Sequence, residues 1–304
     1  MNTLIAMLDK THTFSKKFGK RGSETDILMA HKKIEDSWLT FLDPVKYPEK
    51  IKGLCRSLNL ADMIFLNVDE LDKTLGEMIL AAHLSEKPGV LFSSIYSKED
   101  ISSFIAKTNL KDWKFYDSET DEILNDLIKK TNNESKELEI AIDQVFPVKG
   151  IGVVLLGTVL SGEINVRDTV KLLPSGVLTE VRSIQVHDVD VKTANSGDRV
   201  GLSLKNVVVD KIKDDSLLVS KNNMEWQTTE NEITIKFNQS LIKNPLPPVV
   251  HLSYLLADSV VRIVEQKENQ LTVKSENLMI VKKGVKGLVY QPDTVPRVNA
   301  SFEF

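Results

Sequence analysis

The pattern of apolar residues changes once along this chain, near residue 131, and this change constrains the fold more than any other feature. Up to about residue 128, short apolar runs such as MIFLNV and GVLF alternate with helical segments such as DELDKTLGEMILAAHL. That alternation is typical of a parallel sheet with crossover helices. From Leu138 onward the apolar segments are short, β-branched and bounded by Gly, Asn, Asp or Pro, as in antiparallel barrels or sandwiches.

These patterns predict one parallel α/β domain followed by two antiparallel β-barrels. We expect the α/β domain in residues 1–130, the first barrel in residues 138–222 and the second in residues 230–304. The segment TNNESKE, residues 131–137, has no apolar side chain and is the predicted linker.

Two helices of the first domain carry a start signal. Asp69 precedes ELDKTLGEMI, and Ser97 precedes KEDISSFI with Asp100 three residues further on, a variant of the capping box. We therefore expect Asp69 and Ser97 to be N-caps. Cys55 stands among the apolar positions of the helix KIKGLCRSLNLAD, so we expect it to be buried and not nucleophilic.

Composition excludes several classes of protein. The 304 residues, 41% of them hydrophobic, are enough for several packed domains, and one cysteine excludes an internal disulfide. A net charge of −4 gives no global attraction to nucleic acid, so any such binding depends on local clusters of Lys and Arg. No signal peptide or membrane-length apolar run is evident, so we expect a cytoplasmic protein with no membrane partner and no DNA partner.

The first barrel resembles a known family. The segments DQVFPVKGIGVVLLGTVLSGEINVRDTVKLLP and LTEVRSIQVHDVDVKTANSGDRVGLSLKNV resemble the second domain of translational GTPases, the group of elongation factor Tu, over residues 141–207. The phrases RSIQVHD, A-x-x-GDRV and F-x-x-KG-x-G-x-V are similar to those of the selenocysteine-specific elongation factor. The resemblance implies a translation factor of archaeal type, whose α/β domain and two barrels follow in the same order.

The first domain departs from that family at three nucleotide motifs. The family has G-x-x-x-x-G-K-[ST] after the first strand, whereas this chain has DKTHTFSKKFGKRGSETD. Asp43 stands at the Asp-x-x-Gly motif, but Val45, Lys46 and Tyr47 occupy the place of its Pro-Gly-His part, and SSIYSKED replaces the guanine-reading Asn-Lys-x-Asp. We therefore expect a degenerate P-loop-type domain, a pseudo-GTPase with no catalytic or metal-binding residue and no cofactor. GTP and Mg²⁺ are expected only if the segment between Lys10 and Asp26 forms an unconventional site.

In the family, the first barrel binds the aminoacyl end of tRNA. The resemblance places Asp143, Gln144, Phe146, Gln185 and Arg199 in that pocket: Asp143 for an ammonium group, Phe146 for stacking and Arg199 for a polar or anionic side chain. Gln144 stands where the selenocysteine-specific factor has a basic residue, which argues against selection of selenocysteine. In the alternative reading, Phe146 is barrel core, and Asp143 and Arg199 form an ordinary ion pair at the rim.

Two basic clusters are candidates for contacts with phosphate or RNA, and in the alternative reading both are only solvated surface. They consist of Lys16, Lys17, Lys20 and Arg21 in the first domain and Lys282, Lys283 and Lys286 in the last barrel.

The leading hypothesis is a non-catalytic translation-factor homologue that binds tRNA, the ribosome or a translation protein. One alternative is a weak GTPase or ATPase with an unconventional nucleotide site between Lys10 and Asp26. Another is a purely structural partner of an active elongation factor. The first domain is also open to reading as a different doubly wound domain fused to a barrel.

Overall fold

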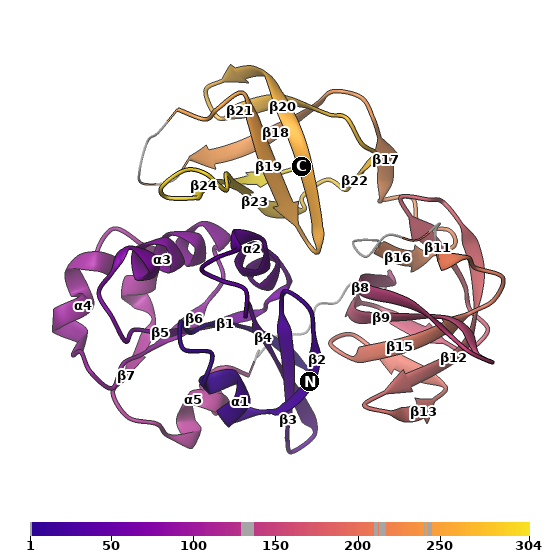
Figure 1. Ribbon diagram of the computed structural model, residues 1–304, viewed down its shortest axis with the longest axis horizontal. Helices are drawn as coiled ribbons and strands as arrows, with labels where there is room; N and C mark the ends of the chain where they lie inside the picture. Colours follow the sequence, from indigo (N-terminus) through magenta and orange to yellow (C-terminus); the bar gives the residue numbers. More distant parts are fainter. Residues whose placement is uncertain (1, 129–136, 210–211, 213–216, 240, 242–244) are drawn as a thin grey trace. The chain divides into compact units, whose positions relative to one another are not determined.

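The computed structural model describes all residues except 1, 129–136, 210–211, 213–216, 240 and 242–244 (Figure 1). The chain divides into two compact units. Unit 1 consists of residues 1–130, 232–274 and 284–304, and unit 2 of residues 131–231 and 275–283. Most of the predicted linker, residues 131–136, lies outside the described residues, and the three predicted domain boundaries stay a prediction. No helix in the described part of the chain is long and apolar enough to cross a membrane.

A seven-stranded sheet forms the centre of the first 130 residues, in the order β2-β3-β4-β1-β5-β6-β7. Strands β4, β1, β5, β6 and β7 are parallel, and β2 and β3 extend the β4 edge antiparallel. The strands are β1 (Thr3–Leu8), β2 (Lys20–Glu24), β3 (Leu28–Ile34), β4 (Ser37–Asp43), β5 (Met63–Asn67), β6 (Gly89–Phe92) and β7 (Lys114–Tyr116).

Helices cover both faces of this sheet, because its central strands are apolar on both sides. In β1, Ala6 and Leu8 pack with α2 and α3, whereas Ile5 and Met7 pack on the opposite face with Phe14 of α1 and with α5. The helices are α1 (Phe14–Phe18), α2 (Ile51–Leu60), α3 (Lys73–Ser85), α4 (Lys98–Ile105), the 3₁₀ helix η1 (Asn109–Asp112) and α5 (Asp121–Asp126).

Of the two predicted N-caps, Ser97 is confirmed and Asp69 is not. Ser97 caps α4 in a complete capping box with Asp100, as expected. The expected cap at Asp69 is wrong: α3 begins at Lys73, and its N-cap is Asp72, whose carboxylate accepts a hydrogen bond of 2.8 Å from the amide of Leu75. Cys55 is fully buried in α2, as expected, and burial raises the pKa of its thiol.

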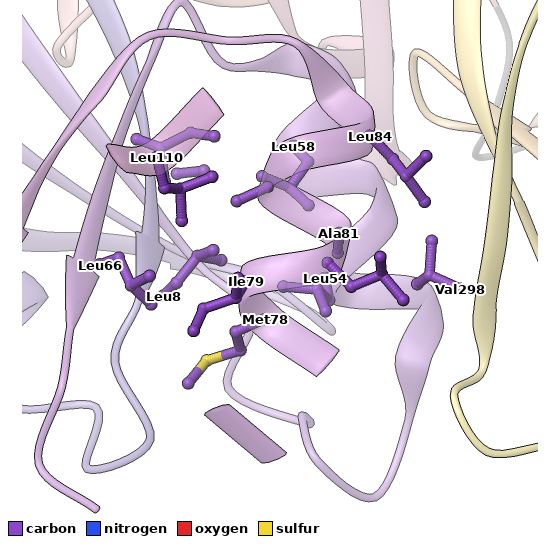
Figure 2. Close-up of a cluster of buried hydrophobic side chains, with 14 of the residues drawn as sticks. Leu8, Leu54, Leu58, Leu66, Met78, Ile79, Ala81, Leu84, Leu110 and Val298 are labelled. Carbon is purple, nitrogen blue, oxygen red and sulfur yellow. The ribbon is translucent and has the colours of Figure 1, made fainter. Parts of the chain in front are cut away.

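The last part of unit 1 is a closed antiparallel barrel with the strand order β18-β21-β20-β19-β23-β24. Its core continues that of α2 and α3: Figure 2 shows Val298 of β24 beside Leu54 and Leu84. Asn59 of α2 also donates a hydrogen bond of 3.1 Å to Ser253 of β19. The strands are β18 (Ile233–Gln239), β19 (Val249–Tyr254), β20 (Ala257–Lys267), β21 (Gln270–Ser275), β23 (Lys286–Tyr290) and β24 (Val298–Glu303).

Unit 2 contains the other barrel. Its main sheet has the order β11-β16-β8-β9-β15-β12-β13, and β11 also pairs with β12, which closes the ring. Two small sheets, β10-β14 and β17-β22, accompany it. The strands are β8 (Glu139–Val148), β9 (Gly152–Ser161), β10 (Glu163–Asn165), β11 (Thr169–Leu173), β12 (Leu178–Val186), β13 (Val189–Val191), β14 (Thr193–Asn195), β15 (Arg199–Leu204), β16 (Leu217–Ser220), β17 (Gln227–Thr229) and β22 (Met279–Val281). The predicted fold class, an α/β domain with two antiparallel β-barrels, is confirmed.

Candidate functional site

Polar residues gather at the carboxyl ends of the parallel strands. Asp9 follows β1, Asp43 and Asn67 end β4 and β5, and Ser93 follows β6. All four side chains are buried, Asp9 with 3% and Asp43 with 0% of its surface exposed. The chain runs from β1 to β4 on one side and returns to β5 on the other, so the strand order reverses at β1. Ligands of open α/β sheets bind at such a reversal, outside the carboxyl ends of the strands.

The Asp9 carboxylate occupies the centre of this position. One oxygen accepts hydrogen bonds from the amides of Thr13 (2.8 Å) and Phe14 (3.0 Å). The other accepts from the Thr11 amide (3.1 Å), the Thr11 hydroxyl (2.7 Å) and the Asn67 side chain (3.0 Å). Successive backbone amides that converge in this way form an anion-binding nest, and here the anion is part of the chain.

Asp9 is held in its ionised form. Burial on its own raises the pKa of a carboxyl group, because it disfavours the charge. The hydrogen bonds from the loop amides, the Thr11 hydroxyl and Asn67 outweigh this effect, and the pKa of Asp9 lies below its ordinary value. The nest therefore contains a permanent negative charge at neutral pH.

Asp43 is satisfied by two side chains of the loop and helix that follow β1. Its carboxylate lies 2.7 Å from His12 Nδ1 and accepts a bond of 2.5 Å from the Ser15 hydroxyl. The second ring nitrogen of His12 lies 3.2 Å from the carbonyl oxygen of Tyr47. The bond to Asp43 raises the pKa of His12, although burial opposes it. Because both ring nitrogens face acceptors, the doubly protonated imidazolium fits this place.

The first basic residue after β1 points away from the nest. Lys10 Nζ lies 2.5 Å from Glu70 and 2.7 Å from Asp72, in the segment that leads into α3. These two carboxylates raise the pKa of Lys10. Asp72 thus serves both as the N-cap of α3 and as the partner of Lys10.

The polar residues after β6 are engaged by their own turn and by the residue that follows β5. The Ser93 hydroxyl donates to the carbonyl of Val68 (2.6 Å) and accepts from the amide of Tyr96 (2.9 Å). The Asp100 carboxylate accepts from the amide and the hydroxyl of Ser97, both at 2.9 Å. This segment therefore closes a turn and caps α4.

In unit 2, Asp143 and Arg199 form a bidentate ion pair. The two guanidinium nitrogens each lie 2.7 Å from a carboxylate oxygen, and the side chains are only 8% and 10% exposed. Asp143 stands at a bulge of β8, between the regular pairs of Ile142 and Gln144. The ion pair of the alternative reading is thus present, and its two charges neutralise each other.

The other predicted pocket residues share the same barrel wall. Cross-strand pairing places Gln144 beside Leu156, Leu156 beside Gly201, and Gly201 beside Gln185, in one row over β8, β9, β15 and β12. Phe146, two residues along from Gln144 and on the same face of β8, keeps 36% of its surface exposed. The structure therefore brings these residues onto one surface, and their role in binding stays a prediction.

The first basic cluster is part of regular structure. Lys16 and Lys17 lie on α1, and Lys20 and Arg21 lie on the edge strand β2. All four side chains are exposed, and Lys17 and Arg21 each form an ion pair with a glutamate. The segment includes a regular edge strand, because β2 pairs with β3, and a role of these side chains in binding phosphate or RNA stays a prediction.

The second basic cluster is largely neutralised. Lys282 lies 2.5 Å from Glu139 and 2.5 Å from a second glutamate, and Lys286 lies 2.6 Å from Glu86. Lys283 is exposed in the turn between them. Lys282 and Lys283 belong to unit 2, and Lys286 belongs to unit 1.

The sequence interpretation missed the role of Asp9, His12 and Ser15. The alternation D-x-T-x-T at Asp9 was the available signal, because Asp side chains readily bind amides two to four residues further on. Asn67 carries no comparable local signal. Among the described residues, no group of three or more His, Cys, Asp or Glu side chains is arranged to hold a metal ion.

The architecture and the comparisons define the class of protein. An α/β domain followed by two β-barrels is shared with translation elongation factor SelB from Methanococcus maripaludis in its apo form, with a TM-score of 0.80 at 22% identity over 100% of this chain and 79% of that chain. The family model for elongation factor Tu domain 2 matches residues 152–214. The fold is therefore that of a translation elongation factor.

Sequence relatives lead to the same family. An uncharacterised protein of Methanocaldococcus jannaschii is 30% identical over 245 residues, which cover 79% of this chain and 78% of that protein. The selenocysteine-specific elongation factor of the same organism is 26% identical over 289 residues, or 86% of this chain, and the match spans 61% of that factor's length. This chain belongs to the translational GTPase family.

Proposed function

We propose that this protein is a non-catalytic translation-factor homologue: its α/β domain holds no guanine nucleotide, and its first barrel binds the aminoacyl end of tRNA. The observation that carries the first half is the Asp9 carboxylate inside the nest of Thr11, Thr13 and Phe14 amides. In P-loop proteins, amides after the first strand cradle phosphate groups. Asp9 competes directly for those donors.

Charge makes this competition decisive. A phosphate oxygen brought to the nest would lie close to an ionised, buried carboxylate. Two unit charges about 4 Å apart repel each other by about 4 kcal/mol at an effective dielectric constant of about 20. That repulsion weakens binding by about a thousandfold. Lys10, the basic residue nearest to the nest in sequence, is held by Glu70 and Asp72 instead.

Base recognition has no support from the segment after β6. A guanine-reading carboxylate must face the base edge, but Asp100 caps α4 through the amide and hydroxyl of Ser97. The Ser93 hydroxyl is engaged by the Val68 carbonyl and the Tyr96 amide. The occupied phosphate cradle and the missing base contact therefore both support an α/β domain that binds no guanine nucleotide.

The surface of the first barrel fits an aminoacyl end whose amino-acid side chain is uncharged. Gln144 and Gln185 present amide groups in one row, and Phe146 offers an exposed aromatic face for a base or amino-acid side chain. Asp143 and Arg199 neutralise each other, so Arg199 is poorly placed to select an anionic selenol. We therefore infer that the ligand is an aminoacyl-tRNA other than selenocysteyl-tRNA.

Two binding measurements on the full chain test this proposal. Isothermal titration with GTP, GDP and ATP in the presence of Mg²⁺ should give no heat of binding. Filter binding of bulk aminoacyl-tRNA at two salt concentrations should show an affinity that falls with salt. Micromolar binding of a nucleotide would refute the pseudo-GTPase half, and binding that disappears on changing Lys20 and Arg21 to alanine would establish the alternative site between Lys10 and Asp26.

A matched pair of variants tests the barrel surface. Removal of a stacking aromatic costs about 1–3 kcal/mol per base, so Phe146→Ala should weaken tRNA binding about fivefold or more. Leu178→Ala removes an exposed apolar side chain from β12 of the same barrel and should leave the affinity unchanged. Equal affinities of the two variants and the wild type would exclude Phe146 from the tRNA site. A protein that binds the ribosome or an elongation factor but no tRNA would favour the structural alternative.

A further inference from the structure

The loop between β4 and α2, residues 44–50, contacts His12 of the β1–α1 loop at one side and Arg297 of the last barrel of unit 1 at the other. We propose that this loop is a relay, through which the His12 side chain fixes the position of Arg297 and so the docking of the last barrel on α3. The proposal concerns unit 1 alone, and it does not depend on the absence of nucleotide binding or on any RNA ligand.

At the nest side, His12 holds two points of the loop. Its Nδ1 lies 2.7 Å from Asp43, and its Nε2 lies 3.2 Å from the carbonyl oxygen of Tyr47. His12 has a left-handed backbone, with φ of 54°, and its ring reaches from the β1–α1 loop to the neighbouring loop. One side chain thereby holds both the last residue of β4 and the middle of the loop.

In the middle, the Tyr47 side chain carries the contact onward. Tyr47 is buried, and its hydroxyl donates to Glu77 of α3 (3.0 Å) and contacts the Thr74 carbonyl (3.2 Å). Burial is the first cause of the raised pKa of Tyr47, and the neighbouring Glu77 adds to it. The hydroxyl therefore remains a donor, and a shift of the Tyr47 backbone must move the ring that bonds Glu77.

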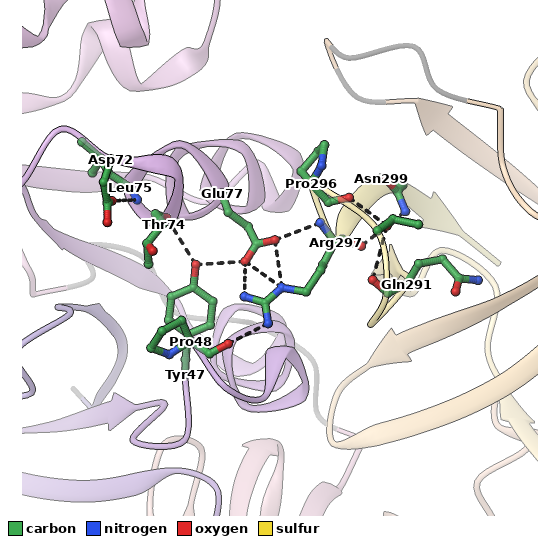
Figure 3. Close-up of polar contacts among 11 residues, drawn as sticks. Tyr47, Pro48, Asp72, Thr74, Leu75, Glu77, Gln291, Pro296, Arg297 and Asn299 are labelled. Atoms are coloured by element: carbon green, nitrogen blue, oxygen red, sulfur yellow. Dashed lines mark hydrogen bonds and ion pairs between the residues drawn. The ribbon is translucent and has the colours of Figure 1, made fainter.

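At the barrel side, Arg297 binds the same glutamate and the same loop. Its backbone amide and guanidinium contact Glu77 at 2.5–3.1 Å, and its Nη1 donates to the carbonyl of Pro48 (2.6 Å). Figure 3 shows Glu77 between Tyr47 and Arg297, with Pro48 below the guanidinium. Arg297 precedes β24, and the next residue, Val298, is fully buried against α2 and α3.

These contacts form one chain of adjacent groups. The Tyr47 carbonyl meets His12, and the next carbonyl in sequence, that of Pro48, meets Arg297. Close-packed, hydrogen-bonded groups move between discrete arrangements rather than deforming continuously. Loss of the His12 contacts therefore frees the loop, and the loop then holds Arg297 less tightly.

A double-mutant cycle tests the relay. His12→Gln and Arg297→Met are combined, and the unfolding equilibrium constant of the full chain is measured in urea. Residues coupled through shared partners depart from additivity, whereas independent sites more than about 7–10 Å apart add. We expect the unfolding equilibrium constant of the double variant to differ by fivefold or more from the value that the two single effects predict when multiplied. Agreement within twofold would overturn the proposal.

The control cycle combines His12→Gln with Lys286→Met. Lys286 also joins the barrel to the C-cap of α3, through Glu86 at 2.6 Å, and neither residue belongs to the loop. The effects of these two changes on the unfolding equilibrium constant should multiply to within twofold. Coupling as strong as that of the first pair would point to a general loosening of unit 1 and would overturn the relay. If Arg297→Met does not fold, Arg297→Lys, which retains the charge but loses the planar donor set, takes its place.

Amide exchange gives a local readout. The amide of Arg297 donates to Glu77, and that of Phe237 donates to Asn269 elsewhere in the same barrel. In the His12→Gln variant, the Arg297 amide should exchange at least fivefold faster, and the Phe237 amide should keep its rate. Unchanged exchange at both amides, or equal acceleration of both, would contradict the relay.

Discussion

The change Asp9→Asn tests the nest most directly, because it keeps the shape of the side chain and removes its charge. One oxygen becomes an NH₂ group, which donates hydrogen bonds and accepts none. If that group faces Thr13 and Phe14, one part-buried and one buried amide lose their acceptor; if it faces Thr11 and Asn67, those donors lose theirs. Either orientation leaves at least two donors unsatisfied.

The expected loss of stability follows from that count. An unsatisfied buried donor costs about 1–3 kcal/mol, and the loop relaxes in part, so we expect a loss of about 2–4 kcal/mol. For a unit of about 150–250 residues, 1 kcal/mol corresponds to about 2–4 °C in Tm. Asp9→Asn should therefore lower the Tm of the transition that contains unit 1 by about 5–15 °C in scanning calorimetry.

A matched control distinguishes the effect of the Asp9 nest from the effect of removing any carboxylate in unit 1. Asp100→Asn alters an exposed cap of α4 in the same unit and should shift the Tm far less. A shift of less than about 2 °C for Asp9→Asn, or equal shifts for the two variants, would refute the view that Asp9 is a structural anion.

Three further predictions follow from individual contacts. The pKa of Asp9 is lowered on folding, so its contribution to stability is present above the unfolded value of 3.8 and is lost as pH falls through the folded pKa; Tm measured from pH 6 to pH 2 should fall more steeply for the wild type than for Asp9→Asn. Arg199→Met leaves the buried Asp143 carboxylate without its partner and should destabilise unit 2 by about 3–5 kcal/mol, whereas the added change Asp143→Leu should restore much of it, as urea unfolding will measure. Leu54→Ala opens a cavity where α2 meets Leu84 and Val298 and should cost unit 1 about 2–5 kcal/mol in the same assay.

The elements with a continuous or periodic apolar pattern were predictable. Strands β1, β5 and β6 read as apolar runs because both of their faces are covered, and α2 and α3 read as helices. The edge strand β2 was missed, because KRGSE is polar and glycine-containing and only one neighbour, β3, pairs with it. Its strand conformation is set by that pairing and not by its own residues.

The cap of α3 shows why a boundary needs tertiary context. Asp69 and Asp72 both precede the apolar part of the helix, and either type of side chain is a good N-cap. The choice falls on Asp72, whose carboxylate bonds Leu75 and at the same time meets Lys10 from another loop. A contact between residues 62 positions apart in sequence leaves no trace in local periodicity.

The absent nucleotide motifs are visible in the sequence, but the contacts at the candidate site could not be predicted from it. A missing Gly-Lys-Ser/Thr triplet is visible in the sequence, and so is the missing Asn-Lys-x-Asp. What fills the site depends on Asn67 and Asp43, which reach the β1–α1 loop only because parallel strands end at one edge of the sheet. The resemblance therefore identified the family, and the geometry of Asp9 and His12 identifies how this member differs.

Loss of a ligand site usually leaves uncompensated groups, and here both kinds of group are compensated internally. Loop amides that would face a phosphate oxygen are satisfied by Asp9, and Asp43 is balanced by His12 and Ser15. Buried donors and charges without partners each cost free energy, so a domain that merely lost its ligand would be destabilised at this edge. Asp9 and His12 come from the same short loop. A few substitutions in one segment therefore suffice to supply both the negative charge for the loop amides and the positive charge for Asp43. Under the proposed function, this internal compensation is what lets the α/β domain keep its fold, and its attachment to the last barrel, without a nucleotide.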